Sequence, residues 1–386
     1  MKQIYFDNNA TTPVAPEVFD AMLPYLTEYY GNPSSMHTFG GQLHKKVEEA
    51  RFKVAELIGA EPEEIIFTSC GTESDNTALM NAVEVSGGKR HIVTTRVEHP
   101  AVMNFAKHLA RKSYRSTFLP VDSLGSLDMQ AFAKALDDDT AIVSIMYANN
   151  ETGVIFPIAA MGAILRERGI IFHSDAVQAA GKIPINVKEL PVDMLSLSGH
   201  KIHASKGIGA LYVRKGTRFY PYVIGGHQER GRRAGTENVA SIIGLGKACE
   251  LAKGDIKNES KYLSGLRDKL EKALLKNCPD ARINGDIQNR LPNTTNISFE
   301  YIEGEAILLR LDEQGVCASS GSACSSGSLE PSHVLRAMGV PFNLIHGSIR
   351  FSLSRYNTEA EVDKVIDIMP ALIKDLRALS PFGKQK

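Results

Sequence analysis

The chain has 386 residues, a length that predicts two to three domains. Hydrophobic residues make up 43% and charged residues 23%, which is typical of a globular protein with a large core and excludes a disordered chain. The 44 Lys and Arg residues balance 44 Asp and Glu residues, so the chain has little electrostatic attraction for nucleic acid.

No apolar run approaches the ~20 residues that a membrane helix needs, and the first residues lack the apolar stretch of a secretory signal. We therefore expect a soluble, cytoplasmic protein. The cysteines are odd in number and widely scattered, which favours free thiols in a reducing compartment over a disulfide framework. The five are Cys70, Cys249, Cys278, Cys317 and Cys324.

Short apolar runs rich in Ile and Val alternate with helical patterns between residues 63 and 215. This alternation predicts an α/β fold with a largely parallel sheet that is covered on both faces. The expected strands are residues 64–68, 91–94, 140–146, 169–173, 192–196 and 209–213.

Strands and helices are more widely spaced after Gly254, which predicts a smaller α+β domain. Its expected elements are a long amphipathic helix (257–276), strands at 296–299 and 348–353, and a last helix (358–379). We expect a large domain of residues 16–255 and a small domain formed by residues 1–15 and 256–386. Residues 315–331 are dominated by Ser, Gly and Ala, so we expect a mobile surface loop there.

Ligands of parallel sheets bind at the carboxyl ends of the strands, and three of these ends carry polar residues. Gly71 and Thr72 open a helix whose free amides would cradle an anion, unless Thr72 and Asp75 form an ordinary helix cap. Asp175 follows a buried strand and needs a cationic or hydrogen-bonding partner; a helix cap or a metal ligand is the alternative.

The third strand end is Lys201, which follows Ser198 and His200. A buried lysine has a lowered pKa that favours Schiff-base formation, whereas a solvated surface lysine is the alternative. Pyridoxal phosphate requires a phosphate anchor, a carboxylate for its ring nitrogen and a Schiff-base lysine. The three strand ends offer this set, so a pyridoxal-phosphate enzyme is favoured over another phosphate-binding α/β enzyme.

Five motifs in this order closely resemble the cysteine desulfurases of the NifS and IscS type, within class V of the pyridoxal-phosphate-dependent aminotransferases. The resemblance extends over nearly the whole chain and implies fold type I, as in aspartate aminotransferase. That fold has a large domain with a mostly parallel seven-stranded sheet and a smaller α+β domain. The motifs are residues 7–13, 30–35, 71–76, 198–201 and 319–324.

The resemblance also implies roles for single residues. Lys201 would hold pyridoxal phosphate, Asp175 would pair with its ring nitrogen, and His99 would stack on the ring. Arg350 would bind the α-carboxylate of L-cysteine through a bidentate pair, close to Asn149. The other cofactor contacts would be Gly71, Thr72, Asn150, Gln178, Ser198, Gly199 and His200, together with Thr236, which would reach the phosphate in the other subunit of a homodimer.

The same resemblance implies that Cys324 is the residue that takes the sulfur from the substrate. Its thiolate would attack the sulfur of L-cysteine, leaving a persulfide on Cys324 and releasing L-alanine. Lys201 would move the α-proton of the substrate, and His99 would take the proton of the thiol. The sulfur would pass to an iron–sulfur scaffold or another acceptor protein for iron–sulfur cluster assembly, and Cys324 would also serve as a transient metal ligand for such a cluster.

Two other classes stay open. A class V aminotransferase or a selenocysteine lyase would keep Lys201, Asp175 and Arg350 but would not need a thiol at Cys324. A non-catalytic sulfur carrier would use the same fold without the cofactor. One segment, residues 202–207, departs from the family pattern, which more often has Gly-Pro before the following Lys and Gly. This departure concerns the shape of a loop and leaves the cofactor prediction unchanged.

Overall fold

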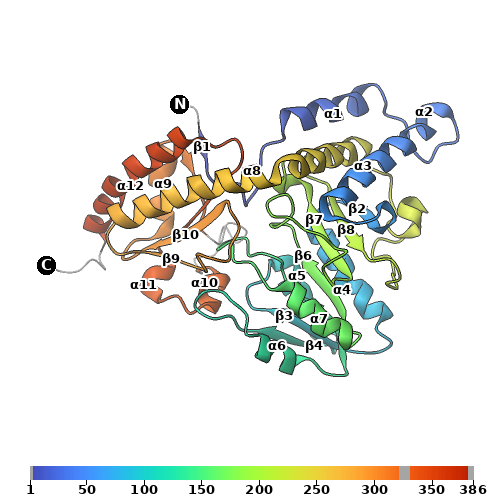
Figure 1. Ribbon diagram of the computed structural model, residues 1–386, viewed down its shortest axis with the longest axis horizontal. Helices are drawn as coiled ribbons and strands as arrows, with labels where there is room; N and C mark the ends of the chain where they lie inside the picture. The colour runs from blue at the N-terminus through green and yellow to red at the C-terminus, as the bar shows by residue number, and fades with distance from the viewer. Residues whose placement is uncertain (1–2, 321–330, 381–386) are drawn as a thin grey trace.

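The computed structural model describes residues 3–320 and 331–380. Two lobes lie side by side in Figure 1, and the long helix α8 (Val239–Asn277) runs across both of them. We call the lobe that contains the seven-stranded sheet the large lobe and the other the small lobe. In the described part of the chain, no helix combines the length and the apolar character needed to cross a bilayer.

The large lobe is built on a seven-stranded sheet with the order β2-β8-β7-β6-β5-β3-β4. Strand β8 is antiparallel to both of its neighbours, and the other neighbouring pairs are parallel, so the prediction of a mostly parallel sheet is confirmed. The strands are β2 (Ile65–Thr68), β3 (His91–Thr95), β4 (Arg115–Leu119), β5 (Thr140–Ser144), β6 (Ile171–Asp175), β7 (Met194–Ser198) and β8 (Gly209–Val213).

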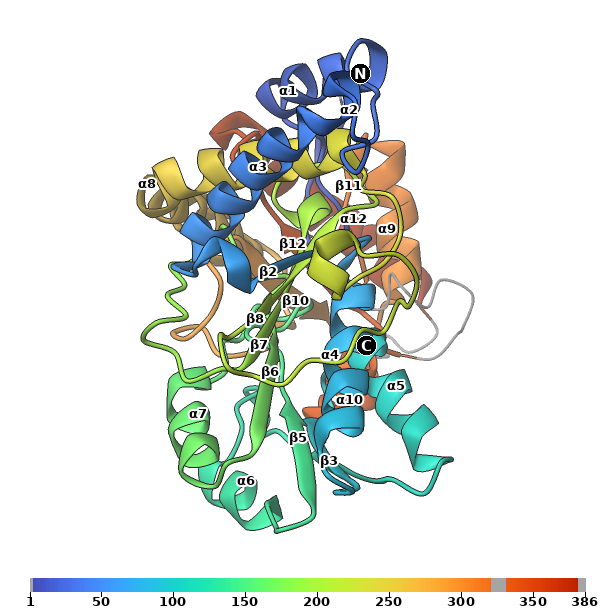
Figure 2. The same ribbon diagram turned by 90° about the vertical axis from the view of Figure 1, so that its right-hand side faces the viewer.

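Neighbouring residues of the central strands are both apolar because each face of the sheet has its own core. Val143 and Leu195 belong to one buried cluster, whereas the adjacent Ile142 and Met194 belong to the cluster on the opposite face. Viewed edge-on in Figure 2, the sheet has α4 and α5 on one side and α6 and α7 on the other. These helices span Gly71–Val85 (α4), Pro100–Ala110 (α5), Met129–Ala135 (α6) and Ile158–Glu167 (α7).

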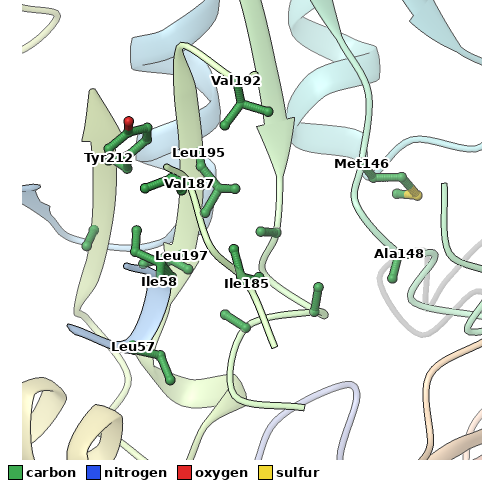
Figure 3. Close-up of a cluster of buried hydrophobic side chains, with 14 of the residues drawn as sticks. Leu57, Ile58, Met146, Ala148, Ile185, Val187, Val192, Leu195, Leu197 and Tyr212 are labelled. Carbon is green, nitrogen blue, oxygen red and sulfur yellow. The ribbon is translucent and has the colours of Figure 1, made fainter. Parts of the chain in front are cut away.

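The first of these clusters also fixes the N-terminal helices to the sheet. Figure 3 shows Ile58, at the end of α3 (Leu43–Ile58), close to Leu197 of β7; Leu57 and Tyr212 of β8 belong to the same cluster. The loop after β6 contributes Val187 to the same cluster. The apolar contacts therefore hold the last strands of the sheet in place, including β7, whose carboxyl end carries Ser198.

The sequence analysis missed one strand, β4 (Arg115–Leu119), which lies at the edge of the sheet and pairs with β3. Only Leu119 of its five residues is buried. An edge strand whose residues are mostly only partly buried needs no continuous apolar run, so it lacks the signal by which the other strands were found.

The small lobe contains an antiparallel sheet with the order β12-β10-β9 and a separate parallel pair, β1 with β11. Its core is distinct from those of the large lobe and includes Leu270, Phe299 and Phe351. The elements are β1 (Ile4–Tyr5), β9 (Ala281–Ile283), β10 (Thr294–Phe299), α9 (Gly304–Glu313), β11 (Val316–Cys317), α10 (His333–Ala337), α11 (Phe342–Ile345), β12 (Ser348–Ser352) and α12 (Glu359–Leu379).

Helix α8 is longer than the predicted helix at 257–276, because Gly254 does not end it. A Cβ atom at Gly254 would meet nothing within 4 Å, so this glycine is exposed on the helix surface and only weakens it locally. Ala252 belongs to a core of the large lobe and Leu263 to that of the small lobe. A domain boundary at 255/256 would therefore lie in the middle of one helix. The predicted division into two domains stays a prediction.

Part of the expected mobile loop at 315–331 is regular structure, since Val316 and Cys317 form β11 beside the start of the chain. Residues 321–330 lie outside the described residues, and Cys324 is among them. The remaining short helices are α1 (Pro16–Thr27), α2 (Thr38–Gly41), η1 (Pro62–Glu64), η2 (Gly199–Lys201) and η3 (Gln228–Gly231).

Candidate active site

A cavity of about 440 Å³ lies at the carboxyl ends of the central strands, and side chains from both lobes line it. Its volume is in the range of small-molecule sites. Ten residues that the sequence analysis selected line this single cavity, although they come from segments more than 250 positions apart. They are Gly71, Thr72, His99, Asn150, Asp175, Gln178, Ser198, His200, Lys201 and Arg350.

Other selected residues do not line the cavity. Thr236 lines a separate cavity of about 240 Å³ together with Arg233 and Glu237. Gly199 is needed for packing, because a Cβ atom there would come within 2.7 Å of Ile208 Cγ2. Cys324 lies outside the described residues. Within the described ranges, no group of three or more metal-ligating side chains could hold a metal ion.

Asn149 also lies outside the cavity, and its buried side chain shapes the turn that follows β5. Its Oδ1 accepts hydrogen bonds from the amides of Glu151 (2.9 Å) and Thr152 (3.0 Å), and its Nδ2 donates to the carbonyl of Val97 (3.1 Å). The adjacent Asn150 is thereby presented to the cavity. A direct substrate contact by Asn149 stays a prediction.

Lys201 ends the short helix η2, which directly follows β7. Its Nζ donates to the carbonyl oxygens of Asn9 and Ala10, each at 2.7 Å. The amine therefore lies partly buried at the cavity wall, in a position fixed by the chain start. This is not the environment of a solvated surface lysine.

Asp175, the last residue of β6, is 7% exposed and accepts one backbone hydrogen bond, from the amide of Val177 at 2.9 Å. Burial raises the pKa of this carboxyl to about 6, against the opposing effects of the Val177 amide and the Lys201 charge. A buried carboxylate with so few donors is stabilised by a further N–H donor in the cavity, such as a protonated ring nitrogen.

A second carboxyl, that of Asp75, belongs to the buried surroundings of Asp175. Burial and the charge of Asp175 both raise the pKa of Asp75, so Asp75 is neutral when Asp175 is ionised. His173 lies 3.6 Å from Asp75 Oδ1, with Ser144 Oγ at 2.8 Å from its Nδ1 and Ser196 Oγ at 2.9 Å from its Nε2. Burial lowers the pKa of His173 to about 3, so this imidazole is neutral.

The start of α4 has the features of an anion site. Its N-cap residue is Cys70, whose side chain makes no capping bond, and Asp75 is buried inside the helix. The alternative of an ordinary cap by Thr72 and Asp75 is therefore wrong. The amides of the first turn are left for a ligand. A Cβ atom on Gly71 would lie 2.8 Å from Val177 Cγ2, so only glycine fits there.

Two further side chains complete this anion site. Ser198 Oγ is buried and has no hydrogen-bond partner. His200 lines the same cavity, with its Nδ1 placed 3.1 Å from Thr11 Oγ1. Burial and the charge of Lys201 lower the pKa of His200 to about 4, so its ring is neutral and one of its nitrogens carries a proton. An unpaired buried hydroxyl beside free amides fits a phosphate group.

His99 is the N-cap of α5, and its Nδ1 accepts the amide of Ala101 at 3.2 Å. Burial, together with the charges of Lys201 and His333, lowers the pKa of His99 to about 4. The ring is therefore neutral, and because Nδ1 is an acceptor, the proton is on Nε2. His99 offers the cavity a flat ring and one N–H donor.

Arg350 comes from β12 of the small lobe and is 2% exposed. Its guanidinium donates to Asp7 Oδ1 (2.7 Å) and to the carbonyl of Asn150 (3.0 Å), while its Nε is buried without a partner. The unpaired N–H and the positive charge suit a carboxylate ligand.

The sequence analysis missed three side chains at this end of the cavity: Asp7, Glu151 and His333. Glu151 and His333 line the cavity itself. Burial raises the pKa of Glu151 to about 7, and Ser332 Oγ donates to its Oε2. Asp7 belongs to a motif on which the family resemblance rests, so that motif was the available signal. The sequence contains no pattern that marks Glu151 or His333.

Comparisons with known proteins agree with this geometry. A family model described as aminotransferase class V matches residues 4–365. A cysteine desulfurase of Nostoc sp. is 63% identical over 382 residues, which is 99% of this chain and 96% of that protein. The cysteine desulfurase NifS of Azotobacter vinelandii is 56% identical over 383 residues, or 99% and 95%. The solved structure of a NifS-like protein has a TM-score of 0.91 at 40% identity and covers 97% of this chain and 100% of that one.

The chain belongs to the class V aminotransferase family, whose members depend on pyridoxal phosphate. Within that family it belongs to the cysteine desulfurases. The predictions of fold type I and of the cofactor are thereby confirmed. The cavity fits this cofactor, because the unpaired Ser198 hydroxyl, the buried Asp175 and the fixed amine of Lys201 meet the needs of its phosphate, its ring nitrogen and its aldehyde.

Proposed function

We propose that this cysteine desulfurase works through the cavity described above, taking the sulfur of L-cysteine and releasing L-alanine. One observation carries the proposal: Asp175 and Lys201, at neighbouring strand ends of the large lobe, and Arg350, from the small lobe, line a single cavity. The relatives named cysteine desulfurase match nearly the whole chain, which supports the choice of substrate. A solved relative described as SspA in complex with cysteine, at 33% identity and a TM-score of 0.80, supports it further.

Bound pyridoxal phosphate supplies an electron sink that acidifies the α-carbon of the substrate. The protein holds the cofactor and the substrate in position. The first-turn amides of α4 and the Ser198 hydroxyl hold the phosphate, while the Asp175 carboxylate keeps the ring nitrogen protonated. Arg350 binds the α-carboxylate of L-cysteine at the opposite lobe. The substrate is thus held between the two lobes, with its α-carbon facing the Lys201 side of the cavity.

Lys201 moves the α-proton of the substrate. Its Nζ is held by two backbone carbonyls of the chain start, those of Asn9 and Ala10. An amine fixed in this way can take a proton from one carbon and return it to another within the same site.

The sulfur step belongs to Cys324. A bond forms between Cys324 Sγ and the sulfur of the substrate as the carbon–sulfur bond of the substrate breaks. The electron pair stays with the substrate carbon, which is protonated and becomes the methyl group of alanine. The described residues on both sides of the Cys324 segment lie at the site: Ser319 pairs with Arg350 through backbone hydrogen bonds, and His333 lines the cavity.

The role of His99 as the base for Cys324 carries one condition. Its Nδ1 already accepts a hydrogen bond from Ala101, and its Nε2 holds the proton. In this tautomer the neutral ring presents an N–H to the cavity and no free acceptor nitrogen. We infer that His99 must lose the hydrogen bond from Ala101 before a ring nitrogen is free to take the proton of the thiol.

The chain acts as a homodimer and delivers its sulfur to an acceptor protein, which for a NifS-like enzyme is an iron–sulfur scaffold. Large exposed apolar side chains on and after α1 support the dimer, because such side chains mark interaction surfaces. They are Phe19, Leu23, Leu26, Tyr29, Tyr30, Met36 and Phe39. Thr236 would then serve the cavity of the other subunit, since it does not line the cavity of its own chain.

The decisive experiment measures L-alanine and sulfide formed from L-cysteine by the holoenzyme. We expect Lys201→Ala to lose the visible absorbance band of the lysine-bound cofactor together with turnover. Cys324→Ser should keep the band and lose turnover. Full turnover by Cys324→Ser without added thiol would indicate an aminotransferase or selenocysteine lyase type of chemistry. A wild-type chain that stays colourless with pyridoxal phosphate would favour a sulfur carrier.

A further inference from the structure

Lys182 lies four residues after Gln178 and has no part in the function proposed above. Its Nζ donates to Gln178 Oε1 at 2.8 Å, and Gln178 Nε2 in turn donates to the carbonyl of Asn9 at 3.0 Å. A carbonyl oxygen only accepts, so the Gln178 amide must turn its nitrogen towards Asn9, which leaves its oxygen towards Lys182.

This orientation decides what Gln178 offers to the cavity that it lines. The amide nitrogen carries two hydrogens, and Asn9 uses one of them. The second hydrogen is left for a ligand. Without Lys182, only the hydrogen bond to Asn9, among those that the described residues make, would hold the amide in this orientation.

The surroundings of Lys182 do not favour its charge. In the described ranges, no carboxylate oxygen lies within 4.0 Å of its Nζ. Burial and the positive charge of Lys201 lower the pKa of Lys182 to about 7, while the nearest opposing effect is the charge of Glu259. Glu259 is itself paired with Arg355. Burial of a poorly compensated cation costs free energy, so its placement behind an active-site amide calls for a functional reason.

Lys182 is also close to the catalytic amine. It lines a small cavity of about 20 Å³ together with Lys201, Glu259 and Arg355. Lys182 therefore lies behind the wall of the active-site cavity. It is bonded to Gln178 and lies near Lys201, both of which line that cavity.

We propose that Lys182 is a positioning residue that holds the Gln178 amide with an N–H towards the cavity, where the ring oxygen of pyridoxal phosphate accepts it. The inference rests on the proposed function, because it takes this cofactor as the occupant. A donor at the ring oxygen stabilises the deprotonated oxygen. This effect lowers the pH at which the lysine-bound cofactor loses its proton.

The test is a spectrophotometric pH titration of the lysine-bound cofactor, without substrate. We expect Lys182→Met to raise the midpoint of the visible transition by about one pH unit. The variant should also bind pyridoxal phosphate about fivefold more weakly, because one hydrogen bond is lost. Lys188→Met is the matched control. Its side chain is 63% exposed and pairs with Glu61, so both quantities should keep their wild-type values.

A double-variant cycle separates positioning from a general structural effect. In a Gln178→Ala background, Lys182→Met should add little to the loss of cofactor affinity, because the amide that it holds is gone. If Lys182→Met does not fold, Gln178→Glu tests the same contact, since a carboxylate keeps Lys182 as its partner but has no N–H; its midpoint should also rise.

Wild-type midpoint and affinity in Lys182→Met, or an equal loss of affinity in the Gln178→Ala background, would overturn the positioning role of Lys182 and leave the proposed function intact. A wild-type chain that forms no visible band with pyridoxal phosphate would overturn both.

Discussion

The two ends of the active-site cavity are built in different ways. At the cofactor end, Asp175 is the last residue of β6, and Gly71 and Lys201 lie shortly after β2 and β7 of the same sheet, so their positions are fixed by the backbone of the large lobe. At the substrate end, Arg350 projects from the small lobe and is held by Asp7 and by the carbonyl of Asn150. The first end depends on a single sheet, whereas the second depends on contacts between segments that are 200 and 343 positions apart.

This difference predicts that damage to the two ends has different kinetic effects. Changes at the cofactor end should act on the affinity for pyridoxal phosphate and on kcat. Changes at the substrate end should act on KM and leave the cofactor in place.

The largest effect is expected for Asp175→Asn. In the proposed function this change removes the anion that would keep the ring nitrogen protonated, so kcat should fall by about 10²- to 10³-fold, and cofactor affinity should fall with it. Alanine release and a fluorescence titration with pyridoxal phosphate measure the two. Asp193→Asn is the control, because Asp193 is also partly buried and accepts the amide of Phe172 at the other end of β6. Unchanged cofactor affinity in Asp175→Asn would contradict this assignment.

A smaller effect is expected for Arg350→Ala at the substrate end. Loss of the charged hydrogen bonds to the α-carboxylate should raise KM for L-cysteine by about 10- to 100-fold, while the spectrum of the bound cofactor stays as in the wild type. Arg310→Ala, an exposed arginine paired with Glu313, should leave KM unchanged. The comparison between the two ends fails if Arg350→Ala loses its cofactor instead.

The smallest effect concerns Glu98, which is fully buried beside the cavity and accepts bonds from Thr95 Oγ1 and the Met146 amide. Burial raises its pKa from 4.5 to about 8, against the effect of these donors. Between these pH values the folded protein binds more protons at this group than the unfolded chain does, so Glu98 makes stability fall as the pH rises.

Glu98→Gln should therefore raise the free energy of unfolding of the apoprotein at pH 8 by about 1 to 2 kcal/mol. It should also reduce the fall of this free energy between pH 5 and 8. Urea unfolding at several pH values measures both. The exposed Glu313→Gln should leave the slope unchanged, and a steeper decline in Glu98→Gln would show that Glu98 is ionised in the folded state.

The same contrast explains how far the sequence could predict the site. The end of a buried strand can be recognised in the sequence as an apolar run followed by a polar residue. The positions of Asp175 and Lys201 could therefore be predicted. The pairing of Asp7 with Arg350 has no local signature, because it depends on how the chain start packs against β12. The inward side chain of Asn149 could not be told from that of Asn150, since both follow the same strand and differ only in the turn they make.

Helix α8 has a mechanical consequence for this two-lobed site. A helix of 39 residues is about 58 Å long, and its two halves are anchored in separate hydrophobic cores. From Lys253 to Tyr262 none of its side chains is buried in either core. Polar contacts, such as those of Glu259 with Arg355 and Tyr262 with Asn357, hold this stretch. The lobes cannot slide past each other along such a rod, so a swing of one lobe needs a slight flexing of this stretch. Any closure of the cavity over L-cysteine would then be an angular motion that brings Arg350 towards Lys201.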